Sequence, residues 1–355
     1  MRALFFLNSF VGGGAERVCL NMAEELYKQG IESEFVTIFD SEPDYDIPSY
    51  MHIFSLKIKD KPLECLNIIK AVPKVNAFIS GKKYELITAH VQPSQFLASL
   101  TLVRNKCFYV MHSRQSDDKS GSLLSGIALR LFLNRKKVVA VSKGVESELN
   151  NKYGINSENT MTIYNPCVIK RIEGEKEFQF PNGRPYILFM GRLEEVKNPL
   201  RVLDLYWKGG FFEQYDLVYL GKGSLEKQLK RQIKEYNLCN HVFFVGFQKN
   251  PVQWLTNASL LLSCSKQEGL PMNLIEALTC GTPVVAVDCP YGPSEILIDK
   301  LSDYLIRPEE EVEKSIAVIA SALECYPEIV ESYYDKFQVS LVVQNYLSAW
   351  KRCFC

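Results

Sequence analysis

No stretch of this 355-residue sequence is apolar for long enough to cross a lipid bilayer. The longest segment without a charged side chain runs from Leu86 to Val103, and His90, Gln92 and Pro93 interrupt it. The opening residues, MRALFFLNSF, lack the long apolar region and the cleavage site of a secretory signal. We therefore expect a cytoplasmic protein, and these features leave peripheral attachment to the inner face of the cytoplasmic membrane open.

The sequence also lacks paired cysteines and an excess of one charge. Its eleven cysteines include no C-x-x-C pair, so neither a zinc site nor a disulfide framework is indicated. The 41 basic and 41 acidic residues cancel, which argues against nucleic acid as a partner. A reducing compartment is the natural setting for so many unpaired thiols.

What the sequence does contain is a regular alternation of short apolar runs with helical segments. This alternation predicts an α/β protein with doubly wound parallel sheets, and the length suits two domains. The charged, irregular stretch from Cys167 to Pro185 is typical of a linker, so we place domains at 1–170 and 171–330, followed by 331–355. The predicted strands are 3–8, 34–39, 53–56, 86–89, 107–111, 137–141 and 161–166 in the first domain, and 186–190, 216–220, 242–245, 258–264 and 283–287 in the second.

Two glutamates eight positions apart, Glu268 and Glu276, follow one of the predicted buried strands. Residues 274–278 have helical character, so Glu268 falls in a strand-to-helix turn and Glu276 about two turns into the helix. The free backbone N–H groups at such a helix start suit a phosphate or a developing negative charge. A pair of acids beside an anion site indicates a binding or catalytic site, although an exposed helix also contains such pairs by chance.

A second predicted strand end carries two cations. Arg192 lies just past the strand at 186–190, and Lys197 follows five residues later. Fixed cations at the mouth of a parallel sheet are what a diphosphate leaving group requires, because its charge grows as the bond to it breaks. On its own, such a pair is equally typical of a solvated turn.

The first domain has a glycine loop and two histidines at strand ends. Gly12 to Gly14 join the first strand to a helix opened by Glu16, but they do not form the G-x-G-x-x-G dinucleotide fingerprint. His90 and His112 end two further strands, where ligands of parallel sheets bind. An imidazole there could hydrogen-bond a sugar hydroxyl without carrying charge.

Four motifs occur in order: GGGAER at 12–17, VSKGV at 141–145, GRLEEVK at 191–197 and QEGLPMNLIEALTC at 267–280. Together they resemble the large family of retaining GT-B glycosyltransferases with a Glu-x7-Glu motif, of the glycosyltransferase family 4 type. The resemblance implies two Rossmann-like domains that face a central cleft. It also implies an acceptor in the first domain, a nucleotide-sugar in the second, and a C-terminal helix that returns to the first domain.

The resemblance further implies residue roles. Arg192 and Lys197 would stabilise the leaving diphosphate, and Glu268 would hydrogen-bond the donor sugar. Glu276 would accept the ribose hydroxyls, and His112 would lie beside the reacting sugar. Further substrate contacts are implied for Gly13, Gly14, Glu16, Gly191, Phe247, Gly269, Leu270, Met272 and Asn273.

The expected reaction is retaining hexosyl transfer, with UDP as the expected nucleotide. No pattern supplies a carboxylate nucleophile on the far face of the sugar, so same-face attack is favoured. The cationic pair can do what a metal would do, and we expect neither metal nor cofactor. The segment CPYGPSEIL resembles segments of bacterial transferases that build surface polysaccharides or lipid-linked oligosaccharides. The alternatives are a nucleotide-sugar epimerase or a phosphorylase of the same fold, or a non-catalytic nucleotide-sugar-binding partner of a membrane glycan-assembly complex.

Membrane contact is a separate question. The segment from Leu123 to Lys137 is apolar over several helical turns and ends in a basic cluster. With the lysines upstream of it, this segment could hold the first domain against anionic lipid. A core helix whose basic end complements the helix dipole would have the same pattern.

Overall fold

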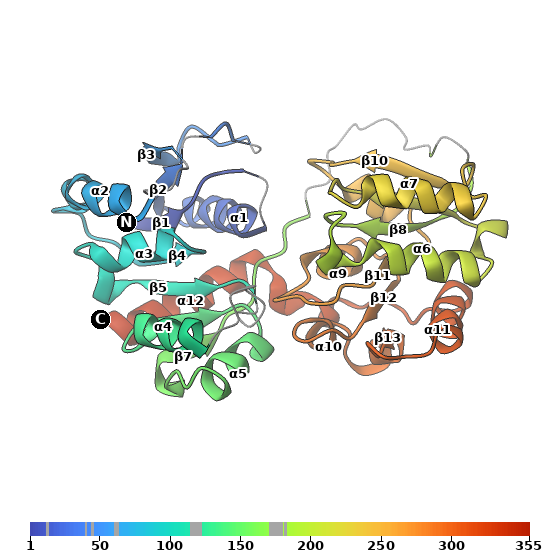
Figure 1. Cartoon of the computed structure of the whole chain (residues 1–355). Coiled ribbons are helices and arrows are strands. Elements are labelled where there is room, and N and C mark those ends of the chain that lie inside the picture. Colours follow the sequence, from blue (N-terminus) through green and yellow to red (C-terminus); the bar gives the residue numbers. More distant parts are fainter. Residues whose placement is uncertain are drawn as a thin grey trace. The chain divides into compact units, whose positions relative to one another are not determined.

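The computed structural model describes residues 1–11, 14–39, 41–43, 46–59, 64–113, 123–169, 180 and 183–355. The chain divides into two compact units, which are described one at a time. The first unit consists of Met1–Cys167 with Phe337–Cys355, and the second consists of Val168–Lys336 (Figure 1). Most of the stretch that we predicted as a linker lies outside the described residues.

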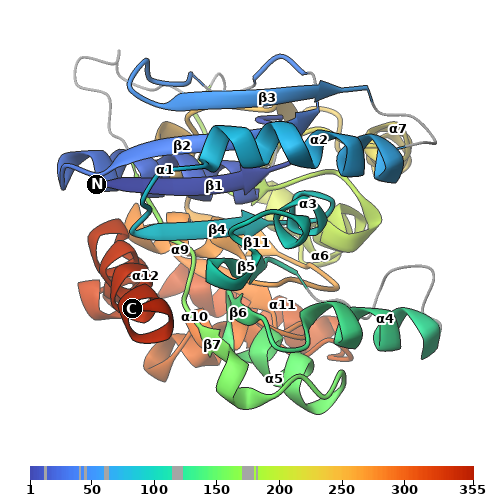
Figure 2. The same cartoon turned by 90° about the vertical axis from the view of Figure 1, so that its left-hand side faces the viewer.

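Within the described residues, the first unit contains a seven-stranded parallel sheet in the order β3-β2-β1-β4-β5-β6-β7 (Figure 2). Most of its strands are apolar runs that are buried along their length, as is typical of parallel sheets covered by helices, whereas the edge strand His52–Ile58 is largely exposed or half-buried. The strands are β1 (Arg2–Leu7), β2 (Glu32–Phe39), β3 (His52–Ile58), β4 (Leu86–His90), β5 (Phe108–Met111), β6 (Lys137–Ala140) and β7 (Thr160–Thr162). The helices are α1 (Gly14–Lys28), α2 (Glu64–Ile79), α3 (Ser94–Leu100), α4 (Leu123–Leu133), α5 (Lys143–Asn151) and α12 (Val339–Phe354).

The connections of this sheet create a switch point beside β1. From β1 the chain proceeds to β2 and β3 on one side, and then returns to β4 on the other side of β1. Ligands of doubly wound sheets bind where the strand order reverses in this way. The first unit therefore offers a site at the carboxyl ends of β1 and β4.

The helix α12 completes the first unit from the far end of the chain. It packs on α1, and three of its aromatic side chains, Tyr346, Trp350 and Phe354, surround Phe108 of β5 at ring-centre distances of 6.3, 5.8 and 5.2 Å. This return of the C-terminal helix was implied by the family resemblance, and the helix begins at Val339, later than the segment 331–355 suggested.

The second unit repeats the plan with six parallel strands among its described residues, in the order β10-β9-β8-β11-β12-β13. Its core joins the inner faces of these strands to the apolar sides of α6, α7 and α11. The strands are β8 (Tyr186–Met190), β9 (Asp216–Leu220), β10 (Val242–Gly246), β11 (Leu260–Ser263), β12 (Val284–Val287) and β13 (Leu305–Ile306). The helices are α6 (Pro199–Lys208), α7 (Glu226–Glu235), α8 (Val252–Thr256), α9 (Met272–Thr279), α10 (Pro293–Ile296) and α11 (Val312–Glu324).

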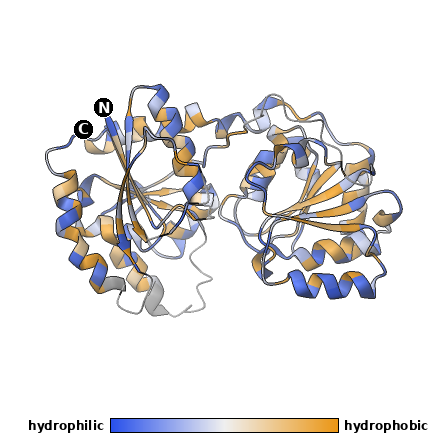
Figure 3. Ribbon diagram, turned by 90° about the horizontal axis from the view of Figure 1, so that it is seen from above, coloured by the Kyte–Doolittle hydropathy of each residue, from blue (hydrophilic) through white to orange (hydrophobic). Residues whose placement is uncertain are grey.

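The distribution of hydrophobic residues explains both sheets. Figure 3 shows hydrophobic residues along the strands of each unit and mixed colouring on the helices around them. The amphipathic helices bury their apolar side against the sheet and expose their polar side. β13 was not predicted, because two residues are too few to give a periodic pattern. Among the described helices, none is both long and apolar enough to cross a membrane.

Candidate active site

Two neighbouring strands of the second unit lead to the residues that the sequence singled out. β8 pairs in parallel with β11, with Ile187 opposite Leu260 and Leu188 opposite Leu261. Their carboxyl ends therefore lie at the same edge of the sheet. Because β9 and β11 flank β8 on opposite sides, this edge is the switch point of the second unit.

Lys197 and Glu268 meet at this edge. Lys197 ends a short 3-10 turn, Glu195–Lys197, in the loop after β8, and Glu268 lies in the loop after β11. The Lys197 Nζ is 2.5 Å from the Glu268 Oε1, and the two side chains are 21% and 9% exposed. The pair fixes one cation and one carboxylate, each compensated by the other, at an edge that solvent still reaches.

The loops that carry this pair are joined to each other. The backbone N–H of Lys266 donates to the carbonyl of Val196 over 2.8 Å. The Lys266 ammonium also forms an ion pair with the Glu195 carboxylate on the surface. The ion pair is exposed and contributes little, but the backbone hydrogen bond fixes the spacing of the two loops.

The helix α9 begins close to this pair. It starts at Met272, and no side chain caps it in the described structure. Gly292 has φ +102°, and a Cβ there would overlap the ring of Pro271, so only glycine allows this loop to lie against the helix start. The uncapped first turn leaves backbone N–H groups for an anion.

The late start of α9 corrects the expected position of Glu276. It is the fifth residue of the helix, just over one turn in, rather than about two turns in. Asn273 lies three residues before it on the same side of the helix, and its Nδ2 donates to the Met190 carbonyl at the end of β8 over 3.0 Å. Glu276 itself is buried, with 7% of its surface exposed.

The remaining predicted residues of the second unit are arranged less closely. Gly191 and Arg192 follow β8 directly, but Arg192 is exposed, and the described structure gives it no contact with Glu268. Hydrogen bonds from Ser224 hold the pKa of Glu194 below its ordinary value, and Arg192 acts in the same direction.

Phe247 follows β10, two strands from β8, and is 52% exposed. Gly269 and Leu270 are buried in the turn before α9.

In the first unit, the two histidines at strand ends form a pair. The His90 Nδ1 is 2.8 Å from the His112 Nε2, and the His90 Nε2 is 2.8 Å from the Thr88 Oγ1. Burial lowers the pKa of His112 to about 4. Burial and then the neighbouring His112 hold the pKa of His90 well below its ordinary value. Both rings are therefore neutral at pH 7, and His112 can act as a hydrogen-bonding group but not as a cation.

The glycine loop is only partly described. Gly13 lies outside the described residues, and Gly14 is the first residue of α1. Glu16, in the first turn of that helix, is 8% exposed, and burial raises its pKa above the usual range. Gly14 and Glu16 thus lie shortly after β1, and the described structure shows no contact between either of them and His112.

Sequence reasoning missed the residues that build the loop between β4 and α3. The Asn8 side chain donates to the Gln92 carbonyl over 2.6 Å and accepts from the Ser94 N–H over 3.0 Å. The Ser94 hydroxyl bonds to the carbonyls of His90 and Val91. Val91 is held at φ +53°, a conformation that a β-branched residue rarely adopts. No local sequence pattern signals bonds between residues so far apart in the chain.

No group of three His, Cys, Asp or Glu side chains in the described parts of the chain could hold a metal ion. The ten cysteines whose side chains are described are free thiols.

Comparison with known proteins supports the resemblance. The sequence model described as Glycosyltransferase Family 4 matches residues 12–171, and the one described as Glycosyl transferases group 1 matches residues 170–337. An Erwinia amylovora relative, the amylovoran biosynthesis glycosyltransferase AmsD, is 23% identical over 81% of this chain and 80% of its own. A Campylobacter jejuni relative, the N-acetylgalactosamine-N,N'-diacetylbacillosaminyl-diphospho-undecaprenol 4-alpha-N-acetylgalactosaminyltransferase, is 26% identical over 86% of each chain.

Solved structures share the fold. Anabaena HepE in complex with UDP and glucose superposes with a TM-score of 0.74 at 19% identity, over 99% of both chains. The apo form of the lipopolysaccharide outer core galactosyltransferase WaaB gives 0.73 at 19% identity, again over 99% of both. With two family models that together span residues 12–337 and two sheets of the expected kind, the chain belongs to the GT-B glycosyltransferases of the family 4 type.

Proposed function

We propose that the protein is a retaining transferase that moves a hexose-type sugar from UDP to a saccharide or lipid-linked saccharide during assembly of a surface polysaccharide or glycan. The observation that carries this proposal is the contact between Lys197 and Glu268 beside the uncapped start of α9. A fixed cation, a carboxylate and free backbone amides together suit a sugar diphosphate. The UDP and glucose bound by Anabaena HepE, which has the same fold, support the choice of donor.

In this proposal the donor's diphosphate lies against Lys197, Arg192 and the first turn of α9. Glu268 hydrogen-bonds the donor sugar, with the N–H groups of Gly269, Leu270 and Met272 beside it. Glu276 of α9 accepts from the ribose hydroxyls. Pro271 has no N–H to contribute.

The transfer exchanges one bond for another on the same face of the sugar. The bond between the anomeric carbon and the diphosphate oxygen breaks, and the acceptor oxygen forms its bond on that face. The acceptor's proton passes to the departing phosphate, whose growing charge Lys197 and Arg192 stabilise. These cations supply what a metal ion would otherwise supply, so we propose that transfer needs no metal. His112 contributes a neutral hydrogen bond to the sugar.

The relatives and α4 support our proposals for the acceptor and the location. The name of the Campylobacter jejuni relative describes an acceptor linked to diphospho-undecaprenol, which supports a lipid-linked acceptor here. Ile127 and Leu131 of α4 are 48% and 71% exposed, unlike the side chains of a core helix. Arg130 and Arg135 lie near the end of the same helix. We therefore propose that α4 contacts anionic membrane lipid.

A two-stage experiment tests the function. Thermal unfolding of the full chain is measured with UDP-, GDP-, ADP- and dTDP-sugars, and we expect a UDP-hexose to raise the unfolding temperature most. Transfer with that donor is then followed by proton NMR, with and without EDTA, and the product should keep the donor's anomeric configuration. Inversion, or activity lost to EDTA and restored by magnesium or manganese, would refute the corresponding part of the proposal. A chain that binds the donor but transfers to no acceptor would favour the non-catalytic alternative.

A further inference from the structure

Thr88 and His90 lie on the same face of β4, two residues apart. Side chains alternate between the two faces of a strand, so this spacing brings the hydroxyl and the imidazole together. The Thr88 Oγ1 is 2.8 Å from the His90 Nε2, and both residues are fully buried. The ring of Phe5, on the neighbouring strand β1, stacks on the His90 ring at a ring-centre distance of 6.3 Å. The His90 ring is therefore held in one orientation within the core of the first unit.

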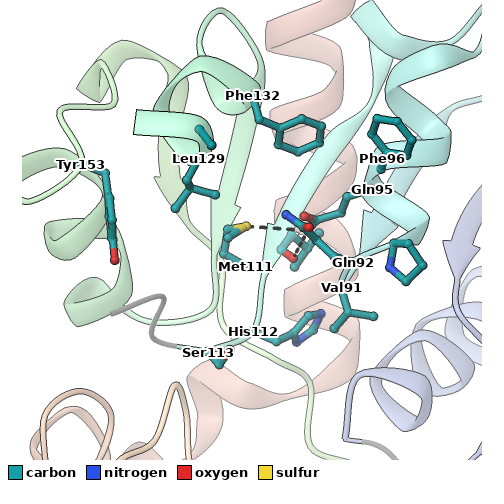
Figure 4. A pocket seen from close by; sticks show the side chains of 13 residues that line it. Val91, Gln92, Gln95, Phe96, Met111, His112, Ser113, Leu129, Phe132 and Tyr153 are labelled. Atoms are coloured by element: carbon teal, nitrogen blue, oxygen red, sulfur yellow. Dashed lines mark hydrogen bonds between the residues drawn. The ribbon is translucent and has the colours of Figure 1, made fainter. Parts of the chain in front are cut away.

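The other nitrogen of His90 contacts His112, which follows the neighbouring strand β5. The His90 Nδ1 lies 2.8 Å from the His112 Nε2. His112 is half-buried and lines a pocket of about 660 Å³, and Figure 4 shows its ring at one edge of this pocket, across from Phe132. Among the described residues, none forms a hydrogen bond with the His112 Nδ1. Nδ1 is thus the ring nitrogen that remains for a bound substrate.

The proton of the Thr88 hydroxyl has one place to go. A hydroxyl has one hydrogen, and a neutral imidazole has one N–H and one nitrogen lone pair. Burial lowers the pKa of both histidines, so both rings are neutral at pH 7. In the described structure, the Thr88 hydroxyl forms one hydrogen bond, to the His90 Nε2. Thr88 therefore donates to His90, because a buried O–H without an acceptor loses its hydration and gains nothing.

The direction of the next bond follows from this one. Since the His90 Nε2 accepts from Thr88, the proton of His90 lies on Nδ1 and is donated to the His112 Nε2. His112 then carries its own proton on Nδ1. The reverse arrangement, in which His112 donates to His90 and His90 donates to Thr88, would leave the Thr88 O–H without an acceptor. One buried threonine thus sets the tautomers of two histidines.

We propose that Thr88 and His90 are positioning residues that fix His112 as a hydrogen-bond donor through its Nδ1. The substrate atom that meets His112 is then an oxygen that accepts, such as a hydroxyl or ring oxygen of a sugar. Because the His112 Nε2 already accepts from His90, His112 has no lone pair for the acceptor's proton and does not serve as a general base. Hydrogen bonds in such a chain polarise one another, which strengthens the last donor. The substrate rests on the proposed transferase function, whereas the tautomers do not.

Nitrogen-15 NMR of the labelled full chain tests the tautomers directly. The chain contains four histidines, and the coupling between two nitrogens across an N–H···N bond identifies the pair. At pH 7, His90 and His112 should both carry their proton on Nδ1. A proton on Nε2 of either ring would overturn the proposal. This measurement uses the wild-type chain, so it is decisive even if a variant fails to fold.

Thr88→Val removes the hydroxyl and keeps the shape of the side chain. His112 should then populate both tautomers, and turnover with the best donor should fall roughly tenfold, about the effect of one hydrogen bond. The affinity for UDP, measured by calorimetry, should not change, because the proposed UDP site is in the second unit. Thr88→Ser restores a hydroxyl and should restore both the Nδ1 tautomer of His112 and most of the turnover.

Thr101→Val is the matched control. Thr101 is as buried as Thr88 in the same unit, and its hydroxyl donates to the Ala98 carbonyl over 2.8 Å. This variant should lose unfolding free energy as Thr88→Val does, but it should keep the wild-type tautomers and turnover. Equal losses of turnover in the two valine variants, or a His112 that stays protonated on Nδ1 alone in Thr88→Val, would overturn the proposal. Absence of UDP binding and of transfer with every donor would overturn the proposed function instead, and the tautomers would still be read from the spectra.

Discussion

The two units differ in the charges that they present at the carboxyl ends of their parallel strands. In the second unit, Lys197 faces Glu268 across the ends of β8 and β11. In the first unit, His90 faces His112 across the ends of β4 and β5, and both rings are neutral. A parallel sheet determines where a ligand binds, but the side chains at the strand ends determine what charge it can have. The charged site suits a diphosphate, and the neutral one suits hydroxyl groups.

The cause of the difference is the partner available to each group. Lys197 and Glu268 have each other as partners of opposite charge. In the described structure, His90 contacts His112, the Thr88 hydroxyl and the ring of Phe5, and His112 contacts His90. None of these groups is an anion that would stabilise an imidazolium. Burial then favours the neutral form of both rings.

The largest expected effect comes from breaking the charged site. Lys197→Ala or Glu268→Gln should lower turnover by roughly 10²–10³-fold, because fixed charges that stabilise a departing group are lost. Removing one partner of a pair whose side chains are only 21% and 9% exposed should also lower the unfolding temperature, so turnover is compared at a temperature at which each variant is folded. Turnover with the best donor and thermal unfolding measure the two quantities.

The matched control lies on the same two loops. Lys266→Ala removes the surface ion pair with Glu195, whose side chains are 52% and 69% exposed. It should leave turnover within about twofold of the wild type. Equal losses of turnover in Lys197→Ala and Lys266→Ala would show that turnover depends on the structure of the loops and not on the charge of Lys197.

The two neutral histidines should make the free energy of unfolding depend on pH. The folded pKa of His112 is about 4, below the model-peptide value of about 6.5, so the unfolded chain takes up the proton first as the pH falls. The stability is therefore intact above about pH 6.5 and declines between pH 6.5 and 4, by at most about 1.4 kcal/mol per pH unit for each histidine.

Urea unfolding at pH 7, 6 and 5 measures this decline. His90→Asn should flatten the slope, because one of the two protons is no longer excluded from the folded state. A slope that stays the same in His90→Asn and in His112→Asn would contradict the assignment of the acid sensitivity to this pair.

Two asparagines sharpen the comparison further, because each fixes the loop geometry at one switch point. Asn8 makes two hydrogen bonds to the loop that holds Val91, and Asn273 makes one to the end of β8. Asn8→Ala should cost roughly 1–3 kcal/mol of unfolding free energy, and Asn273→Ala about half as much. Urea denaturation compares them, and a larger loss in Asn273→Ala would reverse the order.

The sequence predicted the charged site far better than the neutral one. The ends of β8 and β11 could be located from their apolar runs, and parallel pairing brings side chains at such ends together, as it does Lys197 and Glu268. The same reasoning placed His90 and His112 at strand ends, but their direct contact depends on β4 and β5 being neighbours, which no local pattern gives.

The loop held by Asn8 and Ser94 could not be predicted at all. Its bonds join residues more than eighty positions apart, and its strained Val91 violates the local preference of a β-branched residue. The predicted position of Glu276 within its helix was wrong by about one turn. Capping residues are the main sequence signal for the start of a helix, and α9 has no side-chain cap. Local rules fail most where tertiary contacts override them.

The smallest expected effect concerns the surface of the first unit. If α4 lies on lipid, Leu131→Ala should lower binding to vesicles that contain anionic lipid by roughly fivefold, since a few methylenes leave the interface. Leu341→Ala on α12, where the side chain is 40% exposed, should bind as the wild type does. Vesicle co-sedimentation measures both, and neither change should alter transfer to a water-soluble acceptor. Equal binding of both variants would contradict the proposed contact between α4 and the membrane.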